Sequence, residues 1–333
     1  MKLFGKDLDK EILYIAELGV NHEGNIQRCF KLIKEAKTAG ADVVKFQCFT
    51  PENYVSKDIE KYKTVKKFFF NQEKFDKIIK FCKKLKINYL FTPVSHDWIK
   101  YIKKNSNTIK IASGDLNFNF LIKEIVKNNF NIILSTGASN FKEIQKTFKI
   151  IKSKYGKQVF KKLIMMHCVS RYPVPDDEAN LLSISYLKDK FKLTLGYSSH
   201  VIGINACLAS ICMGARVIEF HFTDNKKRKF RDHQLSLDKL DVIKMIKIGN
   251  NYNKLIGKYE KTINKKVQLD KKSLSKGIIV KRSLKKNHKI KINDLNFARP
   301  AKYFHANEIK KILNKQLKKN INFGSLIKKS ILK

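Results

Sequence analysis

The fold of this chain is decided by the stretch Ala41-Asp42-Val43-Val44-Lys45-Phe46-Gln47-Cys48-Phe49, which has the composition of a buried strand. Side chains alternate between the two faces of a strand, so Lys45 and Gln47 share one face and the apolar residues between them share the other. Both faces begin apolar, which is typical of a parallel strand covered by helices. Burying a lysine there is costly unless an anion or a carboxylate meets it. The stretch therefore predicts a parallel sheet and a specific partner for Lys45.

Short apolar strands alternate with amphipathic helices along the first 257 residues. The predicted strands are 12–19, 41–48, 87–92, 108–113, 130–136, 161–168, 193–198 and 216–222. The predicted helices lie near 25–39, 73–85, 96–104, 118–128, 140–154, 177–190, 203–214 and 237–256. Alternation indicates a parallel sheet, and eight units over about 250 residues indicate closure. We therefore expect an α/β fold, a (β/α)8 TIM barrel.

Two regions depart from this alternation. The insertion 50–72 is longer than a normal β-α loop, so we expect a lid or an oligomer contact there. Residues 258–272 are polar and predict a linker, and short β-like pieces with one helix near 306–314 follow it. The predicted domains are a barrel at 1–257 and a small C-terminal module at 273–333.

The formal net charge of +41 first suggests a nucleic-acid or anionic-membrane partner. Only seven of the 70 basic residues are Arg, and Lys is spread over every predicted helix. Readers of nucleic acid rely on Arg for bidentate contacts. Lys, Ile, Asn and Phe are all abundant, as an AT-rich genome would produce. We attribute the high net charge to the residue bias of an AT-rich genome, and we expect neither a nucleic-acid nor a membrane partner.

The cysteines indicate a reducing compartment. The six Cys form no C-x-x-C pair, and most lie on predicted core elements. No apolar segment follows the N-terminal residues as in a signal peptide, and no apolar run approaches the length of a membrane span. We expect a cytoplasmic protein.

Polar residues cluster where the predicted strands end. In a closed barrel the active site lies at the C-terminal ends of the strands, and all eight deliver polar groups there. The residues are Glu17, Lys45, Gln47, Thr92, Lys110, Ser113, Asp115, Ser135, Ser170, Tyr172, Ser198, His200, Glu219 and His221. Two lysines and several hydroxyl groups predict a cradle for phosphate or carboxylate. Two His on adjacent strands could share one metal ion.

Each feature also has a purely structural explanation. Lys45 could form a structural ion pair with Glu17. A single His at a strand end is more often a hydrogen-bonded packing residue than a ligand, and two on neighbouring strands make these readings about equal. Ser135-Thr136-Gly137 alone is a turn. His167 and Cys168 do not predict a nucleophilic pair, because neighbours in a strand face opposite ways. The prediction of a functional site therefore depends on all eight strands delivering polar residues to the same end of the barrel.

Together these motifs resemble the sialic acid synthases, which condense phosphoenolpyruvate with an N-acetylated hexosamine. The resemblance covers nearly the whole chain. The matching stretches are Ile15-Ala-Glu17-Leu-Gly-Val-Asn21-His22-Glu-Gly24, Val44-Lys45-Phe-Gln47, Lys110-Ile-Ala-Ser113-Gly114, Ile133-Leu-Ser135-Thr136-Gly137, His167-Cys168 with Tyr172-Pro173, Ser198-Ser-His200 and His221-Phe-Thr223. The C-terminal module resembles the antifreeze-like (SAF, β-clip type) domain of this family.

The resemblance implies a role for each matching residue. Those that would hold phosphoenolpyruvate are Lys45, Thr92, Lys110, Ser113, Ser135, Ser170 and Ser198. A divalent metal, usually manganese with magnesium or cobalt as alternatives, would be bound by His200 and His221. The residues that would face the sugar or the metal-bound groups are Glu17, Gln47, Asp115, Tyr172 and Asp232. Among them, Glu17 and Asp115 are the candidates for proton handling, in an order that stays open. Arg299 would reach the acyl group of the sugar from the partner subunit of a domain-swapped homodimer.

The sequence also departs from the family pattern. Arg299-Pro300 is commonly followed by a Gly-rich turn, but here Ala301-Lys302-Tyr303-Phe304-His305 follows. Asp115 replaces a common Glu, Ser199 stands where an Asp often precedes the metal His, and Phe220 replaces a frequent basic residue. The residues expected to bind phosphoenolpyruvate thus match the family pattern, while several residues expected near the sugar differ from it.

We therefore expect a nonulosonic acid synthase that uses phosphoenolpyruvate, water and an amino sugar to form a nine-carbon sialic acid and phosphate. N-acetylmannosamine is the default acceptor. A 2,4-diacetamido hexose, giving legionaminic or pseudaminic acid, is the alternative. Another phosphoenolpyruvate-dependent synthase or a metal-dependent aldolase on the same barrel is a second enzyme class. A basic binding protein built on an inactive barrel is the non-enzymatic alternative.

Overall fold

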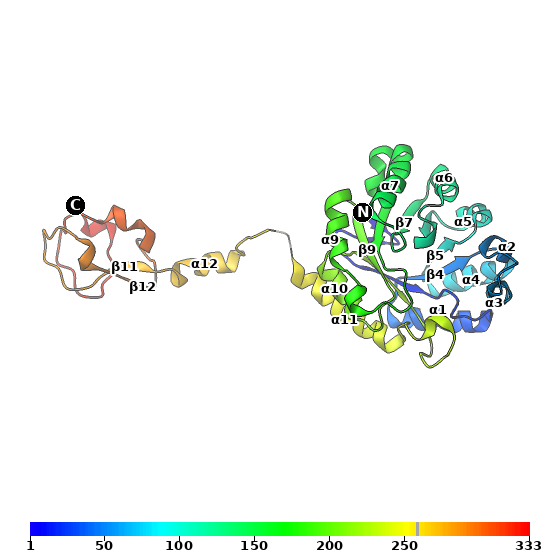
Figure 1. Ribbon diagram of the computed structural model, residues 1–333. Coiled ribbons are helices and arrows are strands. Elements are labelled where there is room, and N and C mark those ends of the chain that lie inside the picture. The colour runs from blue at the N-terminus through cyan, green and yellow to red at the C-terminus, as the bar shows by residue number, and fades with distance from the viewer. Residues whose placement is uncertain (258–259) are drawn as a thin grey trace. The chain divides into compact units, whose positions relative to one another are not determined.

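The computed structural model, which describes residues 1–257 and 260–333, divides the chain into two compact units on either side of Gly257. The first unit is a closed barrel of parallel strands with helices around its outside (Figure 1). Around the barrel the strands follow the order β10-β3-β4-β5-β6-β7-β8-β9, so the last strand closes on the first. The predicted (β/α)8 barrel is confirmed.

The barrel strands are short and almost entirely buried. They are β3 (Leu13–Glu17), β4 (Val43–Cys48), β5 (Asn88–Pro93), β6 (Thr108–Ile111), β7 (Asn131–Ser135), β8 (Leu163–His167), β9 (Thr194–Ser199) and β10 (Val217–His221). The helices around them are α1 (Ile26–Ala39), α4 (Gln72–Leu85), α5 (Ile99–Asn105), α6 (Asn119–Lys127), α7 (Phe141–Tyr155), α8 (Val159–Lys162), α9 (Leu182–Phe191), α10 (Asn205–Cys212) and α11 (Lys239–Ile256).

Two apolar layers hold the barrel together. The layer between strands and helices contains Phe46, and the layer inside the barrel contains Val43 and its neighbours from the other strands. Because β4 alternates between these layers, Lys45 and Gln47 face the barrel interior above Val43, as the opening stretch predicted. Each strand thus buries apolar residues near its start and presents polar residues near its end.

A short N-terminal hairpin closes the opposite end of the barrel. It consists of β1 (Lys2–Leu3) and β2 (Lys6–Asp7), and Leu3 and Leu8 pack into the apolar layer inside the barrel. The sequence predicts no strands here, because a two-residue strand is too short to show periodicity.

The insertion 50–72 forms two short helices, α2 (Pro51–Tyr54) and α3 (Lys61–Phe68). Helix α3 lies against the loop after β3: Gly24 there has φ +75°, and a Cβ at this position would come within 2.1 Å of the Lys67 carbonyl oxygen. Phe68 also stacks on Phe230 of the loop after β10, with ring centroids 4.6 Å apart. The insertion is therefore packed onto two active-site loops of its own unit.

The second unit has its own apolar core, which contains Ile278, Val280, Ile290, Ile312, Leu317 and Ile327. Strands β11 (Gly277–Val280) and β12 (Leu295–Ala298) pair antiparallel. Helix α12 (Lys265–Leu274) lies partly in the stretch predicted as a linker, where the Asn264 side chain caps it by accepting from the Val267 N–H. The helix predicted near 306–314 is instead a 3-10 segment, Ala306–Lys311, a form of helix that is common in short pieces.

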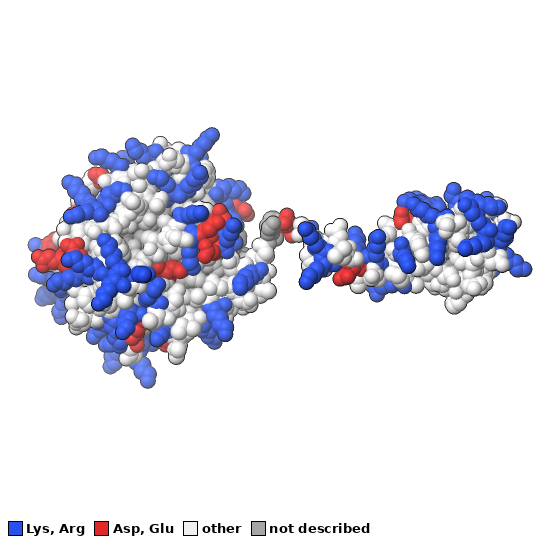
Figure 2. Space-filling model, turned by 180° about the vertical axis from the view of Figure 1, so that it is seen from behind, with Lys and Arg blue, Asp and Glu red and all other residues white. Residues whose placement is uncertain are grey.

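Basic residues do not gather into a single stripe on the face of the molecule seen in Figure 2. Figure 2 shows Lys and Arg scattered over the face in view, with acidic residues among them. All six cysteines are free thiols. Within the described part of the chain, every helix is too short or too polar to cross a membrane.

Candidate active site

The C-terminal ends of the barrel strands surround a cavity of about 680 Å³. Every predicted site residue of the first unit lines it: Glu17, Lys45, Gln47, Thr92, Lys110, Ser113, Asp115, Ser135, Ser170, Tyr172, Ser198, His200, His221 and Asp232. Glu219, Cys168, and Tyr54 and Lys61 of the insertion also line it. Arg299 belongs to the second unit.

Four buried charges form the floor of the cavity. The Lys45 ammonium lies 2.8 Å from Glu17 Oε2 and 3.3 Å from Glu219 Oε1. Glu17 and Lys45 are direct partners in the register of β3 and β4. The Lys110 ammonium lies 3.7 Å from Glu219 Oε2. Glu219 therefore bridges the two lysines, and the structural ion pair that the sequence offered as an alternative is present within a larger cluster.

Polar side chains from neighbouring strands complete this floor. Lys45 donates to Thr92 Oγ1 at 3.2 Å, and Lys110 donates to Ser135 Oγ at 2.6 Å. Ser198 donates to Glu219 Oε1 at 3.0 Å, and Gln47 donates to Glu17 Oε1 at 3.1 Å. Each charged group thus contacts a neutral partner that could be exchanged for a ligand.

The cluster sets the protonation of its members. Burial opposes the charge on Lys45, but Glu17 and Glu219 outweigh it and raise the pKa of Lys45. Burial lowers the pKa of Lys110, with Lys45 adding to the effect and Glu219 opposing it. Burial alone would raise the pKa of Glu219, but the two lysines hold it well below its ordinary value. An anionic ligand would therefore meet two ammonium groups that Glu219 already shares, and it would have to compete with that carboxylate.

The turn after β7 brings a second group of polar residues close together. Ser113 Oγ lies 2.8 Å from Cys168 Sγ and accepts a hydrogen bond of 3.1 Å from the Gly137 N–H. A Cβ on Gly137 would come within 2.4 Å of Cys168 Sγ and 2.8 Å of Ser170 Oγ. Ser135-Thr136-Gly137 is therefore both a turn and part of the site, because only glycine leaves room for these neighbours.

His200 and His221 face each other at the other end of the cavity, with ring centroids 5.3 Å apart. His200 Nδ1 lies 2.7 Å from the Val169 carbonyl oxygen, so it carries the proton and Nε2 is left as an acceptor. The Tyr172 ring lies 4.1 Å from His200. Burial and the neighbouring His221 lower the pKa of His200 to about 4. The ring of His200 is therefore neutral at physiological pH.

His221 differs from His200 in its hydrogen bonding and in the direction of its pKa shift. Its Nδ1 is buried and makes no hydrogen bond, and the nearest carboxylate oxygen is Asp232 Oδ2 at 3.4 Å. Burial opposes protonation, but Asp232 outweighs it and raises the pKa of His221. Among the described residues, no three or more His, Cys, Asp or Glu side chains gather as a metal cluster. The cavity therefore offers a metal ion two imidazoles, and oxygen atoms of substrate or water would supply its other ligands.

Comparison with known proteins gives this site a family. Residues 32–261 match the NeuB family, which is more than half of the chain. The chain belongs to the NeuB family. It is 32% identical over 334 residues to N,N'-diacetyllegionaminic acid synthase of Campylobacter jejuni, covering 96% of this chain and 99% of that protein.

Two solved structures resemble this NeuB chain. N-acetylneuraminic acid synthetase from Leptospira borgpetersenii, in complex with citrate, is 28% identical with a TM-score of 0.74, over 78% of this chain and 90% of that chain. A putative spore coat polysaccharide biosynthesis protein E from Chromobacterium violaceum, 22% identical, matches in fold with a TM-score of 0.82 over 97% of this chain and all of that one.

Asp115 is a carboxylate of this NeuB cavity whose pKa lies close to neutral pH. It ends the 3-10 turn Ser113–Asp115 after β6, and its side chain makes no hydrogen bond or ion pair with the described residues. Burial raises the pKa of Asp115 to about 6, although Lys110 opposes the shift. Glu17, by contrast, is engaged by Lys45 and Gln47. The geometry therefore favours Asp115 for proton transfer near neutral pH.

The sequence placed Glu219 among the polar residues at the strand ends but gave it no role, and it did not predict His233 at all. Glu219 had a readable signal, because it lies two positions before His221 and so shares its face of β10. His233 has no such signal, since it lies in a single 3-10 turn, Arg231–His233, between β10 and α11, which is too short to show periodicity.

Proposed function

We propose that this chain is a nonulosonic acid synthase, which joins phosphoenolpyruvate to an amino sugar and releases phosphate. The observation that carries the proposal is that two buried lysines, two imidazoles and a titratable carboxylate line one cavity. A cavity of about 680 Å³ has room for two small substrates side by side. Membership of the NeuB family supports this reading.

Phosphoenolpyruvate binds at the floor in this proposal. Its negative groups pair with Lys45 and Lys110 and displace the contacts that Glu219 makes with them. The hydroxyl groups of Thr92, Ser113, Ser135, Ser170 and Ser198 line the same end and donate to the remaining oxygens.

The reaction needs one new C–C bond, one new C–O bond from water to C2, and one broken C–O bond to the phosphate. C3 of phosphoenolpyruvate attacks the aldehyde carbon of the open-chain sugar, and the aldehyde oxygen takes up a proton to become a hydroxyl group. Water adds to C2 and gives its proton to Asp115, the carboxylate without an ion pair. The tetrahedral intermediate then releases phosphate by cleavage of the bond between C2 and the oxygen that bridges to phosphorus, the C2 hydroxyl proton leaves with the phosphate, and a keto group remains.

His200 and His221 hold a divalent metal, with manganese as the first candidate, in this proposal. Their support is the fixed, neutral ring of His200 and the buried, unbonded Nδ1 of His221. When bound, such an ion polarises a carbonyl oxygen as a Lewis acid. Tyr172, Gln47 and Asp232 line the same end and face the sugar.

The acceptor sugar has two candidates. N-acetylmannosamine is the default for the resemblance described above. A 2,4-diacetamido hexose is favoured by the similarity to N,N'-diacetyllegionaminic acid synthase, because that similarity extends over 96% of this chain.

We assign residues 273–333 to an antifreeze-like (SAF) domain that completes the site in a domain-swapped homodimer. The match to a solved structure along 97% of the chain supports a shared fold for both units. Arg299 is exposed, and its Nε donates to the Leu274 carbonyl oxygen at 2.6 Å, which leaves the rest of the guanidinium available for the acyl group of the sugar. Mixing the variants Arg299→Ala and His221→Ala, each expected to keep only a low rate, should give more activity than either alone, since one site of each mixed dimer would be intact.

The test is phosphate release from phosphoenolpyruvate with manganese and a panel of N-acetylmannosamine and 2,4-diacetamido hexoses. We expect release with at least one sugar, loss of release on chelation, and no metal dependence in His200→Ala or His221→Ala. Erythrose 4-phosphate in the panel checks the related synthase class. Binding of phosphoenolpyruvate without release with any sugar would exclude the proposed reaction, and activity that survives chelation would exclude the metal. A gel shift that survives moderate salt would favour a nucleic-acid-binding protein.

A further inference from the structure

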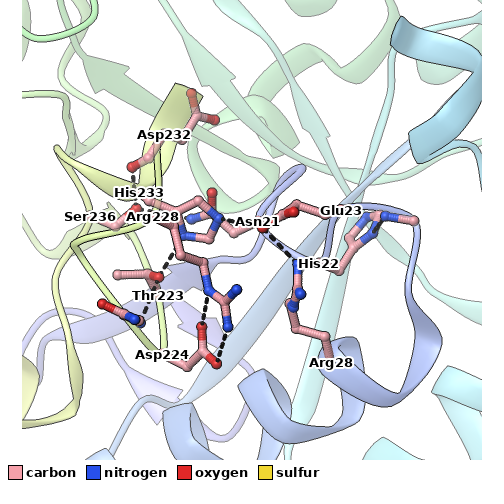
Figure 3. Close-up of polar contacts among 12 residues, drawn as sticks. Asn21, His22, Glu23, Arg28, Thr223, Asp224, Arg228, Asp232, His233 and Ser236 are labelled. Atoms are coloured by element: carbon pink, nitrogen blue, oxygen red, sulfur yellow. Dashed lines mark hydrogen bonds and ion pairs between the residues drawn. The ribbon is translucent and has the colours of Figure 1, made fainter. Parts of the chain in front are cut away.

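A network of buried polar side chains connects two loops at the point where the barrel closes (Figure 3). The first loop follows β3 and carries Asn21 and Glu23, and the second spans 222–238 between β10 and α11 and carries Asp232. Strands β3 and β10 are direct neighbours, with Glu17 opposite His221. The two loops therefore leave the barrel side by side, just above the imidazole end of the cavity.

His233 is the centre of this network and is fully buried. Its Nε2 lies 3.2 Å from Glu23 Oε1, and its Nδ1 lies 2.6 Å from Thr223 Oγ1. A carboxylate only accepts, so Nε2–H donates to Glu23 and Nδ1 accepts from the Thr223 hydroxyl. Glu23 is held in turn by Arg28, whose Nη1 lies 2.6 Å away. Both ring nitrogens are thus committed, and they join the two loops.

A second set of hydrogen bonds starts at Asn21 of the first loop and reaches Asp232. Asn21 is fully buried, and its Nδ2 donates to the Phe222 carbonyl oxygen at 2.9 Å and to Ser236 Oγ at 3.0 Å. Ser236 Oγ donates to the Asp232 carbonyl oxygen at 2.5 Å. His233, the next residue in the chain, therefore fixes one side of Asp232 and Ser236 fixes the other, while Asp232 Oδ2 lies 3.4 Å from His221 Nδ1.

We propose that His233 is a positioning residue that holds Asp232 against His221 and thereby sets the acceptor end of the cavity. The proposal deepens the proposed function and rests on it. His233 is not among the residues that line the cavity, so it acts on the reaction only through Asp232. Residues that orient the direct ligands of a site typically contribute about 10- to 100-fold to affinity or activity.

The test is His233→Ala in the full-length protein. We expect kcat/KM for the sugar to fall by about 10- to 100-fold, while KM for phosphoenolpyruvate stays within about threefold. His233→Gln keeps a donor at the position of Nε2, so it should recover part of the loss. Ser210→Ala is the matched control: it removes a buried hydrogen bond to the Cys207 carbonyl oxygen on α10 and should leave the ratio of the two KM values unchanged.

Two further measurements separate positioning from general destabilisation. In an Asp232→Asn background, His233→Ala should cost nothing more in sugar KM, because both act through one group. Amide hydrogen exchange of 223–236 should be faster in His233→Ala and unchanged in Ser210→Ala. This measurement needs no substrate, so it tests the loop attachment even if the parent protein turns over no sugar. Unchanged exchange, additive effects, or equal losses for both substrates would overturn the proposal.

Discussion

The two ends of the cavity are built in different ways. At the floor, Lys45, Lys110 and Glu219 project from strand interiors, and none is more than 4% exposed. At the rim, Tyr172 and Asp232 lie on loops, and Tyr172 is 55% exposed. The strand register fixes the floor, whereas hydrogen bonds and ring contacts between loops fix the rim. A single substitution at the floor therefore removes a charge from the cluster of lysines and glutamates, while a substitution at the rim changes the orientation of a neighbouring side chain.

The two ends also respond differently to pH. At the floor, Lys45 and Lys110 hold the pKa of Glu219 well below its ordinary value, so this carboxylate stays ionised. The rim contains groups that change charge at higher pH, because the pKa of Asp115 is about 6 and that of His200 is about 4. We infer that substrate anions are held by a floor of constant charge, and that pH acts on catalysis through the rim.

The largest effect is expected for Lys45→Met at the floor. Removing this ammonium leaves Glu17 and Glu219 buried with one cation fewer, which should cost about 3 to 5 kcal/mol of stability. We expect KM for phosphoenolpyruvate to rise by at least about 100-fold and KM for the sugar to change far less, because the lost contact is with the anion. Steady-state kinetics with each substrate varied in turn, together with thermal unfolding, measures both effects.

The control for this prediction is the double variant Lys45→Met with Glu17→Gln. It removes one buried negative charge together with the cation, so it should recover stability but not the affinity for phosphoenolpyruvate. If both substrates lost affinity equally, or if activity returned with stability, Lys45 would be a structural ion-pair residue only.

The contrast between the two ends also explains what the sequence could predict. Lys45 was readable because a strand has a period of two, and a charge in an apolar strand stands out. The bridging role of Glu219 was not readable, because it depends on barrel closure: β10 pairs with β3 and brings Glu219 within reach of lysines on β4 and β6. His233 lies in a loop without periodicity, and its partners Glu23 and Thr223 are defined only by the packing of two loops.

The second largest effect is expected for Asp115→Asn at the rim. With a pKa of about 6, Asp115 becomes ionised as pH rises from 5 to 7, so the parent rate should increase through this range. The variant should lose this dependence and about 10²-fold in kcat, the lower end of the usual contribution of a general base. Measuring kcat of the parent and the variant from pH 5 to 8 tests this prediction. If kcat of the variant still rose with pH in this range, a residue other than Asp115 would be the general base.

The same substitution should act on stability in the opposite direction. The pKa of Asp115 is higher in the folded chain than its ordinary value of 3.8, so the folded state binds more protons between these values. Its contribution to stability is present at low pH and is lost as pH rises through about 6. Asp115→Asn should therefore raise the unfolding temperature at pH 7 and leave it nearly unchanged at pH 3.5.

The smallest effect is expected for Lys61→Met, a cation at the rim on helix α3. Lys61 lines the cavity but is exposed, so water and salt screen its charge, unlike that of Lys45. We expect kcat/KM for phosphoenolpyruvate to fall by about two- to threefold at 20 mM salt and not at all at about 500 mM, since the effect is steering alone. Lys63→Met is the matched control, because this exposed lysine lies on the same helix and does not line the cavity. If kcat/KM of Lys61→Met stayed low at high salt, the rim would also bind the anion directly. The distinction between a floor that binds the anion and a rim that orients neighbouring groups would then be wrong.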